Sequence, residues 1–195
     1  NPRDRDRLPA GYEAAASVLF PDVEYVAPDG RGRDEMCAIF GCGADDLPGG
    51  EGWGNEHVTR SGSHMGTHVD APLHYGSTCE GAPARTITDI ALGELFLPGA
   101  VLDVRDAAKP GEAIPSGALL EAVKALDWER PAASALLLRT GQEDHDLDGP
   151  SFFHYPGMSR EGTLLLAEMG GKVLGTDALG WDRPFLVMAE AFRRT

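Results

Sequence analysis

The segment from His64 to His74, which reads HMGTHVDAPLH, places three imidazoles and one carboxylate within eleven residues. The four positions are His64, His68, Asp70 and His74, and all of them are even numbers. Because alternate side chains of an extended strand share a face, the four would converge on one side. Imidazole and carboxylate suit Zn²⁺, Mn²⁺ or Fe²⁺, and a further imidazole can move protons near neutral pH. The segment therefore predicts a divalent metal site with a proton-transfer group.

A helix is the competing geometry for this segment, because histidines four residues apart also share a helix face. Asp70 lies six residues from His64 and would fall well round a helix. Gly66 and Pro72 also disfavour a helix. We therefore expect a strand or strand edge that loosens into a turn at Pro72. The simpler interpretation, histidines that only hydrogen-bond or face water, fits a lone histidine better than four such groups in register.

The same residues carry a specific resemblance. The segment closely resembles the HxGTHxDxPxH signature of the metal-dependent cyclase family, which includes bacterial kynurenine formamidases, isatin hydrolases and cyclase-like enzymes of aromatic polyketide pathways. The fixed positions of that signature are all present, namely His64, Gly66, Thr67, His68, Asp70, Pro72 and His74. The resemblance implies that His64, His68 and Asp70 are metal ligands. It also implies that His74 is the catalytic acid or base, and that one or two ions, Zn or Mn, are bound.

Weaker similarities follow in the family's order. Residues 135–141, ALLLRTG, resemble a buried strand ending in an Arg-Thr-Gly turn, and residues 156–159, PGMS, resemble a segment that opens a helix. Residues 175–177, GTD, followed by Asp182, resemble a further segment. Together the similarities cover roughly residues 57 to 183. They imply an α/β fold, a swivelling β/β/α domain with a partly barrel-like mixed sheet, and a homodimer or homotetramer.

The family's late metal ligands have no counterpart in these residues. The resemblance implies a further His, and a Glu or Gln, after the GTD segment, but the last histidine here is His154. Glu190 is a carboxylate in that region, but AEAFRR is typical of an exposed helix, so we do not assign it as a ligand. Either the remaining ligands lie beyond Thr195 or this member has an incomplete site. We expect the first.

Composition and charge narrow the function classes. The 195 residues suit one domain, and no apolar run approaches the roughly 20 residues of a membrane span. A net charge of −14 argues against nucleic acid or an anionic membrane as partner. The three cysteines form no CxxC pair, which argues against a disulfide framework and a structural zinc site. Without a secretory pattern at the start, we expect a cytoplasmic protein.

The elements that must position these residues fall into two parts. We expect residues 1–56 to form an N-terminal arm and Gly-rich pocket loops, at 29–33 and 48–55, with Trp53 and Tyr25 as aromatic candidates or ordinary surface residues. Residues 57–195 should form the core. Strands are expected at 57–63, 95–104, 135–138 and 172–176, a strand or turn at 85–90, and helices at 12–19, 116–126 and 159–169. Ser116 and Ser159 are the expected N-caps. Strands and helices that alternate indicate an α/β protein.

Three functions are open at this point. The first is a metal-dependent hydrolase that attacks an amide, lactam or ester carbonyl of an aromatic small molecule, with His74 moving the proton. The second is a cyclase or lyase of aromatic polyketide biosynthesis, favoured by residues 180–184, GWDRP, which resemble cyclase-like members. The third is a non-catalytic metal-binding protein with a relict site. We expect the first.

Overall fold

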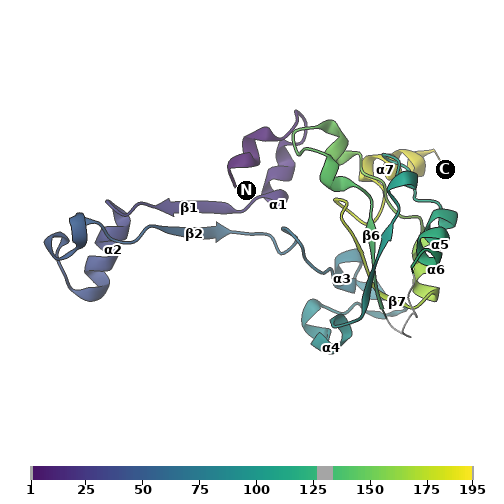
Figure 1. The fold of residues 1–195 in the computed structure, drawn as a ribbon, viewed down its shortest axis with the longest axis horizontal. Coiled ribbons are helices and arrows are strands. Elements are labelled where there is room, and N and C mark those ends of the chain that lie inside the picture. Colours follow the sequence, from purple (N-terminus) through teal and green to yellow (C-terminus); the bar gives the residue numbers. More distant parts are fainter. Residues whose placement is uncertain (1, 127–133, 195) are drawn as a thin grey trace. The chain divides into compact units, whose positions relative to one another are not determined.

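The structure is a computed structural model that describes residues 2–126 and 134–194. The chain divides into two compact units, Asn1–Asp70 and Ala71–Thr195 (Figure 1). The domain boundary expected at residue 57 stays a prediction, because compactness alone does not define a family core.

The first unit is built on an antiparallel pair of strands, β1 (Asp22–Val26) and β2 (Asn55–Arg60). Asp22 joins the strands to the N-terminal segment, because its carboxylate lies 2.7 Å from Arg5 and 2.8 Å from Arg60. The hydrogen bond from Arg5 is the main cause of the lowered pKa of Asp22. The strand expected at 57–63 is confirmed as far as Arg60, and it begins two residues earlier.

Helices and short 3₁₀ turns accompany these strands in the described part of the first unit, residues 2–70. The helices are α1 (Ala16–Leu19) and α2 (Arg31–Phe40), and the 3₁₀ turns are Pro2–Arg7, Glu13–Ala15, Ala44–Asp46 and Pro48–Gly50. The helix expected at 12–19 is confirmed as a 3₁₀ turn followed by α1.

The prediction that residues 29–33 form a loop is wrong from Arg31 onward, because α2 begins there. Gly32 is buried in the first turn of α2, and a Cβ at this position would clash with the backbone carbonyl of Trp53. The glycine that indicated a loop instead allows a helix to lie close against another backbone segment.

The second unit holds the main sheet, in which three parallel strands run in the order β5–β6–β7. These strands are β5 (Gly99–Asp103), β6 (Ser134–Arg139) and β7 (Gly171–Thr176). A small hairpin pairs β3 (Thr78–Cys79) with β4 (Ala82–Pro83). The helices are α3 (Pro72–Tyr75), α4 (Leu92–Leu95), α5 (Ser116–Lys124), α6 (Arg160–Glu168) and α7 (Phe185–Arg193). The 3₁₀ turns are Ile87–Asp89, Arg105–Ala107, Gln142–Asp144 and Pro150–Phe153.

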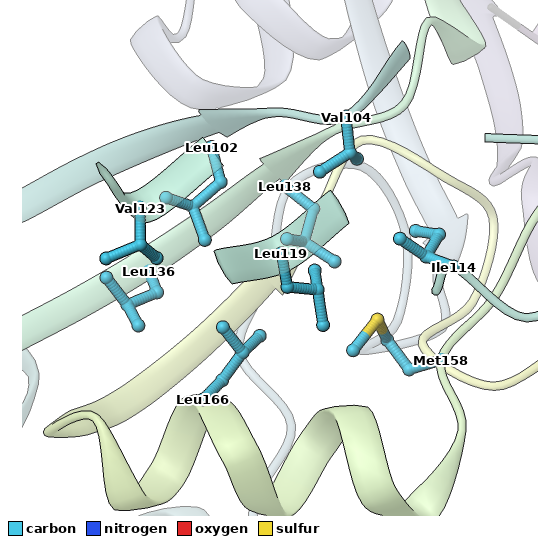
Figure 2. Packing of buried hydrophobic residues seen from close by; sticks show 9 residues of the cluster. All are labelled: Leu102, Val104, Ile114, Leu119, Val123, Leu136, Leu138, Met158 and Leu166. Atoms are coloured by element: carbon cyan, nitrogen blue, oxygen red, sulfur yellow. The ribbon is translucent and has the colours of Figure 1, made fainter. Parts of the chain in front are cut away.

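The hydrophobic core of this unit lies between the sheet and the helix pair α5 and α6 (Figure 1). Figure 2 shows Leu166 of α6 directed toward the sheet residues Leu136 and Leu138. Leu166, Leu136 and Leu119 of α5 are fully buried. Burial of apolar side chains is the main favourable term in folding, so this cluster fixes the two helices on the sheet.

The strands and helices expected in this half of the chain are largely confirmed. Residues 135–138 and 172–176 lie in β6 and β7, and the strand expected at 95–104 is β5. The expected strand or turn at 85–90 is a 3₁₀ turn. Ser159 caps α6, since its hydroxyl accepts a hydrogen bond from the backbone N–H of Gly162 at 3.1 Å. The cap expected at Ser116 is wrong, because Pro115 is the N-cap residue of α5 and Ser116 is already helical.

The α/β class is confirmed. Within residues 2–126 and 134–194 the sheets are small and none closes into a barrel, and the sheet that carries the core is purely parallel. Over the same residues, no helix has the length and apolar character that crossing a membrane requires.

Asp177 joins the end of β7 to the turn that follows β6. Its carboxylate accepts hydrogen bonds from the N–H and hydroxyl of Thr140, at 2.8 and 2.7 Å, and from the N–H of Gly141, at 3.1 Å. The N–H of Gln142 donates to the same carboxylate at 3.3 Å. Burial raises the pKa of Asp177, but the hydrogen bonds, led by those from Thr140, outweigh it and the net pKa is lowered. The weak RTG and GTD similarities are therefore two halves of one structural contact.

Candidate metal centre

The histidine-rich segment is a loop, and the expected strand is wrong. Residues 61–71 carry no strand hydrogen bonding, and α3 begins at Pro72. Gly66 has a φ of 69°, in the left-handed region, which ends the alternation that a strand would need. The alternation of side chains along a strand therefore does not explain how the polar side chains of this segment meet.

The loop itself brings two imidazoles to one carboxylate. His64 Nδ1 lies 2.7 Å from Asp70 Oδ1, and His68 Nε2 lies 3.3 Å from the same oxygen. The two imidazole rings are nearly perpendicular, at 87°, with centroids 5.0 Å apart. The Asp70 side chain is the most covered of the three, at 24% exposed, against 39% for His64 and 31% for His68.

The backbone of Gly66 fixes which nitrogen of His68 can bind a metal. His68 Nδ1 lies 2.7 Å from the carbonyl oxygen of Gly66. Because a carbonyl only accepts, Nδ1 carries the hydrogen and donates it. A neutral His68 ring then presents its lone pair at Nε2, on the side that faces Asp70. Histidines that bind metals commonly donate their other N–H to a carbonyl in this way.

The donor set therefore fits a divalent metal. In the tautomer with its hydrogen on Nδ1, His68 Nε2 and the Asp70 carboxylate oxygen, 3.3 Å apart, both offer electron pairs, and a cation near them would offset their repulsion. His64 and Asp70 also lie among the residues whose ligand atoms are close enough to share an ion. Imidazole with carboxylate is a donor set for Zn²⁺ or Mn²⁺ and does not by itself choose between them.

His74 lies on α3 and not on an extended strand. Pro72 is the first residue of α3, where its missing N–H costs nothing. The N–H of Leu73 donates to the carbonyl of Arg85 at 3.1 Å, which ties α3 to the following segment. The His74 ring is exposed and meets the ring of Tyr75 edge to face, with centroids 5.3 Å apart. The side chain is thus held on a short helix with an aromatic neighbour.

The other histidine, carboxylate and aromatic residues of interest lie outside the histidine-rich segment. Glu190, which we did not assign as a ligand, lies on α7 with an exposed side chain, 3.7 Å from Arg194. His57 lies on β2 with its Nε2 3.3 Å from Asn55 Nδ2. Trp53 stacks edge to face with Phe40, and Tyr25 is half-exposed on β1.

The residue pattern does not reveal the role of Gly66, because a glycine there only disfavours a helix. In the structure the carbonyl of Gly66 orients His68. The signal that could have indicated this is the spacing, since a carbonyl two residues before a histidine is within reach of Nδ1 when the intervening chain turns back.

Comparisons with known proteins agree with the motif. The model of the Cyclase family matches residues 15–183. Isatin hydrolase A from Labrenzia aggregata, bound to benzyl benzoate, is a similar solved structure, with a TM-score of 0.51 and 22% identity over 68% of this chain. The match covers 53% of that chain, so the present chain spans about half its length.

A crystal structure described as a novel cyclase has a TM-score of 0.49 and 14% identity, over 94% of this chain and 76% of that one. A search of the curated proteins found no match. At 22% identity, the isatin hydrolase structure supports a similarity of fold alone. The family model matches most of the chain, including the whole histidine-rich segment, and the chain therefore belongs to the Cyclase family.

Proposed function

We propose that the chain is a metal-dependent hydrolase that acts on an amide, lactam or ester carbonyl of an aromatic small molecule. One observation carries the proposal: His64 and His68 converge on a single oxygen of Asp70, at 2.7 and 3.3 Å. The ion would be Zn²⁺ or Mn²⁺, one or two per chain, held by these three residues.

A bound divalent ion supplies Lewis-acid polarisation of a carbonyl and lowers the pKa of water. The chain's own groups do the rest. Gly66 holds His68 in one tautomer through the 2.7 Å contact with Nδ1. Asp70 adds the negative charge that makes the donor set attractive to a cation.

His74 is the proposed acid and base. It would take a proton on one ring nitrogen as water adds to the carbonyl, and return that proton to the leaving nitrogen or oxygen. Its place supports this role, because it lies four residues after Asp70, on α3, with an exposed ring.

An aromatic substrate is supported by two observations. Tyr75 is 64% exposed and touches His74, so an apolar ring stands beside the proposed acid and base. Isatin hydrolase A, whose fold this chain shares, is by its name a hydrolase of isatin, an aromatic lactam.

The polyketide cyclase alternative has less support. It depends on residues 180–184, in which Trp181 Nε1 donates to Thr163 Oγ1 at 3.0 Å. Trp181 also contacts the core, and the backbone N–H of Met158 donates to its carbonyl at 2.8 Å. Trp181 therefore has a structural role in the core, and this role accounts for the residue without a polyketide substrate.

The metal assignment is tested by elemental analysis of purified protein. His68→Ala and Asp70→Ala should each lose most of the bound metal, whereas His57→Ala, on β2, should keep it. Metal content unchanged in both ligand variants would exclude the proposed ligands. His74→Ala should keep the metal and lose turnover by about 10²–10⁴-fold.

The reaction class is tested by absorbance with isatin and N-formylkynurenine as substrates. Hydrolysis of either one by the metal-loaded wild type, lost in His74→Ala, is the expected result. Turnover of a poly-β-ketone substrate without hydrolysis of any aryl amide, lactam or ester would favour the cyclase. Metal retention with no turnover on either class would favour the non-catalytic interpretation.

We further propose that the chain forms a homodimer or homotetramer. Light scattering would measure the oligomeric state.

A further inference from the structure

The end of α2 brings two cysteines together. Gly41 follows the helix with a φ of 66°, and its N–H donates to the carbonyl of Cys37. The N–H of Cys42 donates to the same carbonyl at 3.2 Å. This hydrogen bond is the mark of a Schellman-type helix end, in which the residue after the left-handed one turns back over the last helical turn. Side chains at these two positions, here Cys37 and Cys42, commonly touch.

The backbone turn brings the two cysteines near one another, and both are partly accessible. Cys37 and Cys42 are half-buried and free, and Cys42 lies close enough to contribute, after burial, to the raised pKa of the Cys37 thiol. A fully buried pair would be protected from reagents, and a fully exposed pair would not be held together. The third cysteine, Cys79, is exposed on β3, in the second unit.

We propose that Cys37 and Cys42 form a reversible redox pair that a small-molecule disulfide, such as oxidised glutathione, closes into an intramolecular disulfide. One cysteine thiolate attacks a sulfur of the oxidised glutathione and releases one glutathione thiolate. The second cysteine then attacks the mixed disulfide at the protein sulfur and releases the other. The two cysteine protons end on the two glutathione thiols, so two electrons pass from the protein to the reagent.

Closure would constrain a contact within the first unit. Phe40 lies between the two cysteines in sequence and meets the Trp53 ring edge to face, with centroids 6.0 Å apart. The disulfide would tie the last turn of α2 to residue 42 and hold Phe40 in place.

The test uses the full chain, treated with graded ratios of oxidised to reduced glutathione, alkylated and measured by intact mass and peptide mapping. The expected product has lost two hydrogen atoms, with residues 37 and 42 linked. Cys79→Ser should close equally well. Because the neighbouring thiol acts at millimolar effective concentration, intramolecular closure should exceed intermolecular pairing by on the order of 1000-fold at micromolar protein.

Single-cysteine variants separate the two thiols. Cys37→Ser should accumulate a stable glutathione adduct on Cys42, and Cys42→Ser should accumulate one on Cys37. Adducts on either residue of the wild type without a 37–42 link, or thiols that remain alkylatable at every ratio while Cys79 reacts, would overturn the proposal.

Gly41 offers a matched pair of variants. A Cβ at residue 41 meets nothing within 4 Å, so a substitution there adds only conformational strain. Gly41→Ala should lower the equilibrium constant for closure on the order of tenfold, because alanine disfavours the left-handed region, whereas Gly41→Asn should lower it less. If both variants formed the disulfide as readily as the wild type, with unchanged circular dichroism, the helix end would not be what brings the thiols together.

Discussion

Gly66 illustrates how one backbone conformation decides what a side chain can bind. Its left-handed φ of 69° lets its carbonyl accept from His68 Nδ1, which leaves Nε2 for a ligand. A Cβ at residue 66 meets nothing within 4 Å, so alanine adds strain without a clash.

Gly66→Ala should therefore weaken metal affinity about tenfold, because the left-handed region costs roughly 1–2 kcal/mol for alanine. Metal titration by calorimetry or competition with a chelator would measure it. Gly62→Ala, in the same loop with equally open space and no positive φ, is the control. An affinity lowered equally in both variants would contradict the role of the Gly66 conformation.

Asp177 is the residue whose ionisation should matter most to the turn after β6. Burial raises its pKa, but the hydrogen bonds, led by those from Thr140, outweigh burial, so its pKa is lowered in the folded chain. Above the unfolded value of about 3.9, the carboxylate is charged in both states and stabilises the fold. As the pH falls below this value, the unfolded chain takes up the proton first, so this stabilisation is lost.

Asp177→Asn should lower the free energy of unfolding by on the order of 2 kcal/mol at pH 6. The difference from wild type should shrink as the pH falls below about 4. Chemical denaturation at several pH values would measure both. Asp45→Asn, at an exposed position in the 3₁₀ turn Ala44–Asp46, is the control. A constant difference across the pH range would show that the ionised form is not what stabilises the turn.

At the scale of elements, the two helices that cover the sheet begin differently. The hydroxyl of Ser159 caps α6 through Gly162, whereas Ser116 is the first residue of α5 and makes no side-chain cap. The same residue type thus has two different tasks. The difference follows from Pro115, whose extended conformation places the start of α5 one residue earlier than expected.

Ser159→Ala should destabilise the chain by about 1 kcal/mol, because a backbone N–H of α6 loses its acceptor. Ser116→Ala should change stability by less than about 0.5 kcal/mol. Thermal or chemical unfolding of the two variants side by side measures the contrast. Equal losses would mean that the cap of α6 contributes nothing measurable.

At the scale of the whole molecule, stability in the second unit depends on the cluster that joins α5 and α6 to the sheet (Figure 2). Leu166 is fully buried in that cluster, whereas Leu164, on the same helix, is 44% exposed. The pair separates helix propensity from core packing, because both substitutions shorten a leucine in α6.

Leu166→Ala should cost about 2–5 kcal/mol, the sum of lost burial and the cavity left behind. Leu164→Ala should cost about 1 kcal/mol or less. Denaturant unfolding provides both values. If the two variants lost the same stability, the buried face of α6 would have been misassigned.

Much of the main sheet could be predicted from the sequence. Residues 135–138 form a continuous apolar run, which is typical of a parallel strand, and Ser159 precedes an amphipathic run. The histidine-rich segment could not be placed by the same reasoning. Its alternation suggested a strand, but a strand needs a hydrogen-bonded partner and allowed φ angles, and the conformation of Gly66 provides neither.

The sequence by itself determined the family and the α/β class and predicted the candidate donor set, because residue types and their order do not depend on the local geometry. Tertiary structure decided how the donors meet, through the loop that folds Asp70 back to His64. It also decided that Thr140 and Asp177, 37 residues apart, make one contact. Periodicity reports only which side a residue faces on its own element, and these contacts depend on backbone turns and strand pairing that periodicity does not encode.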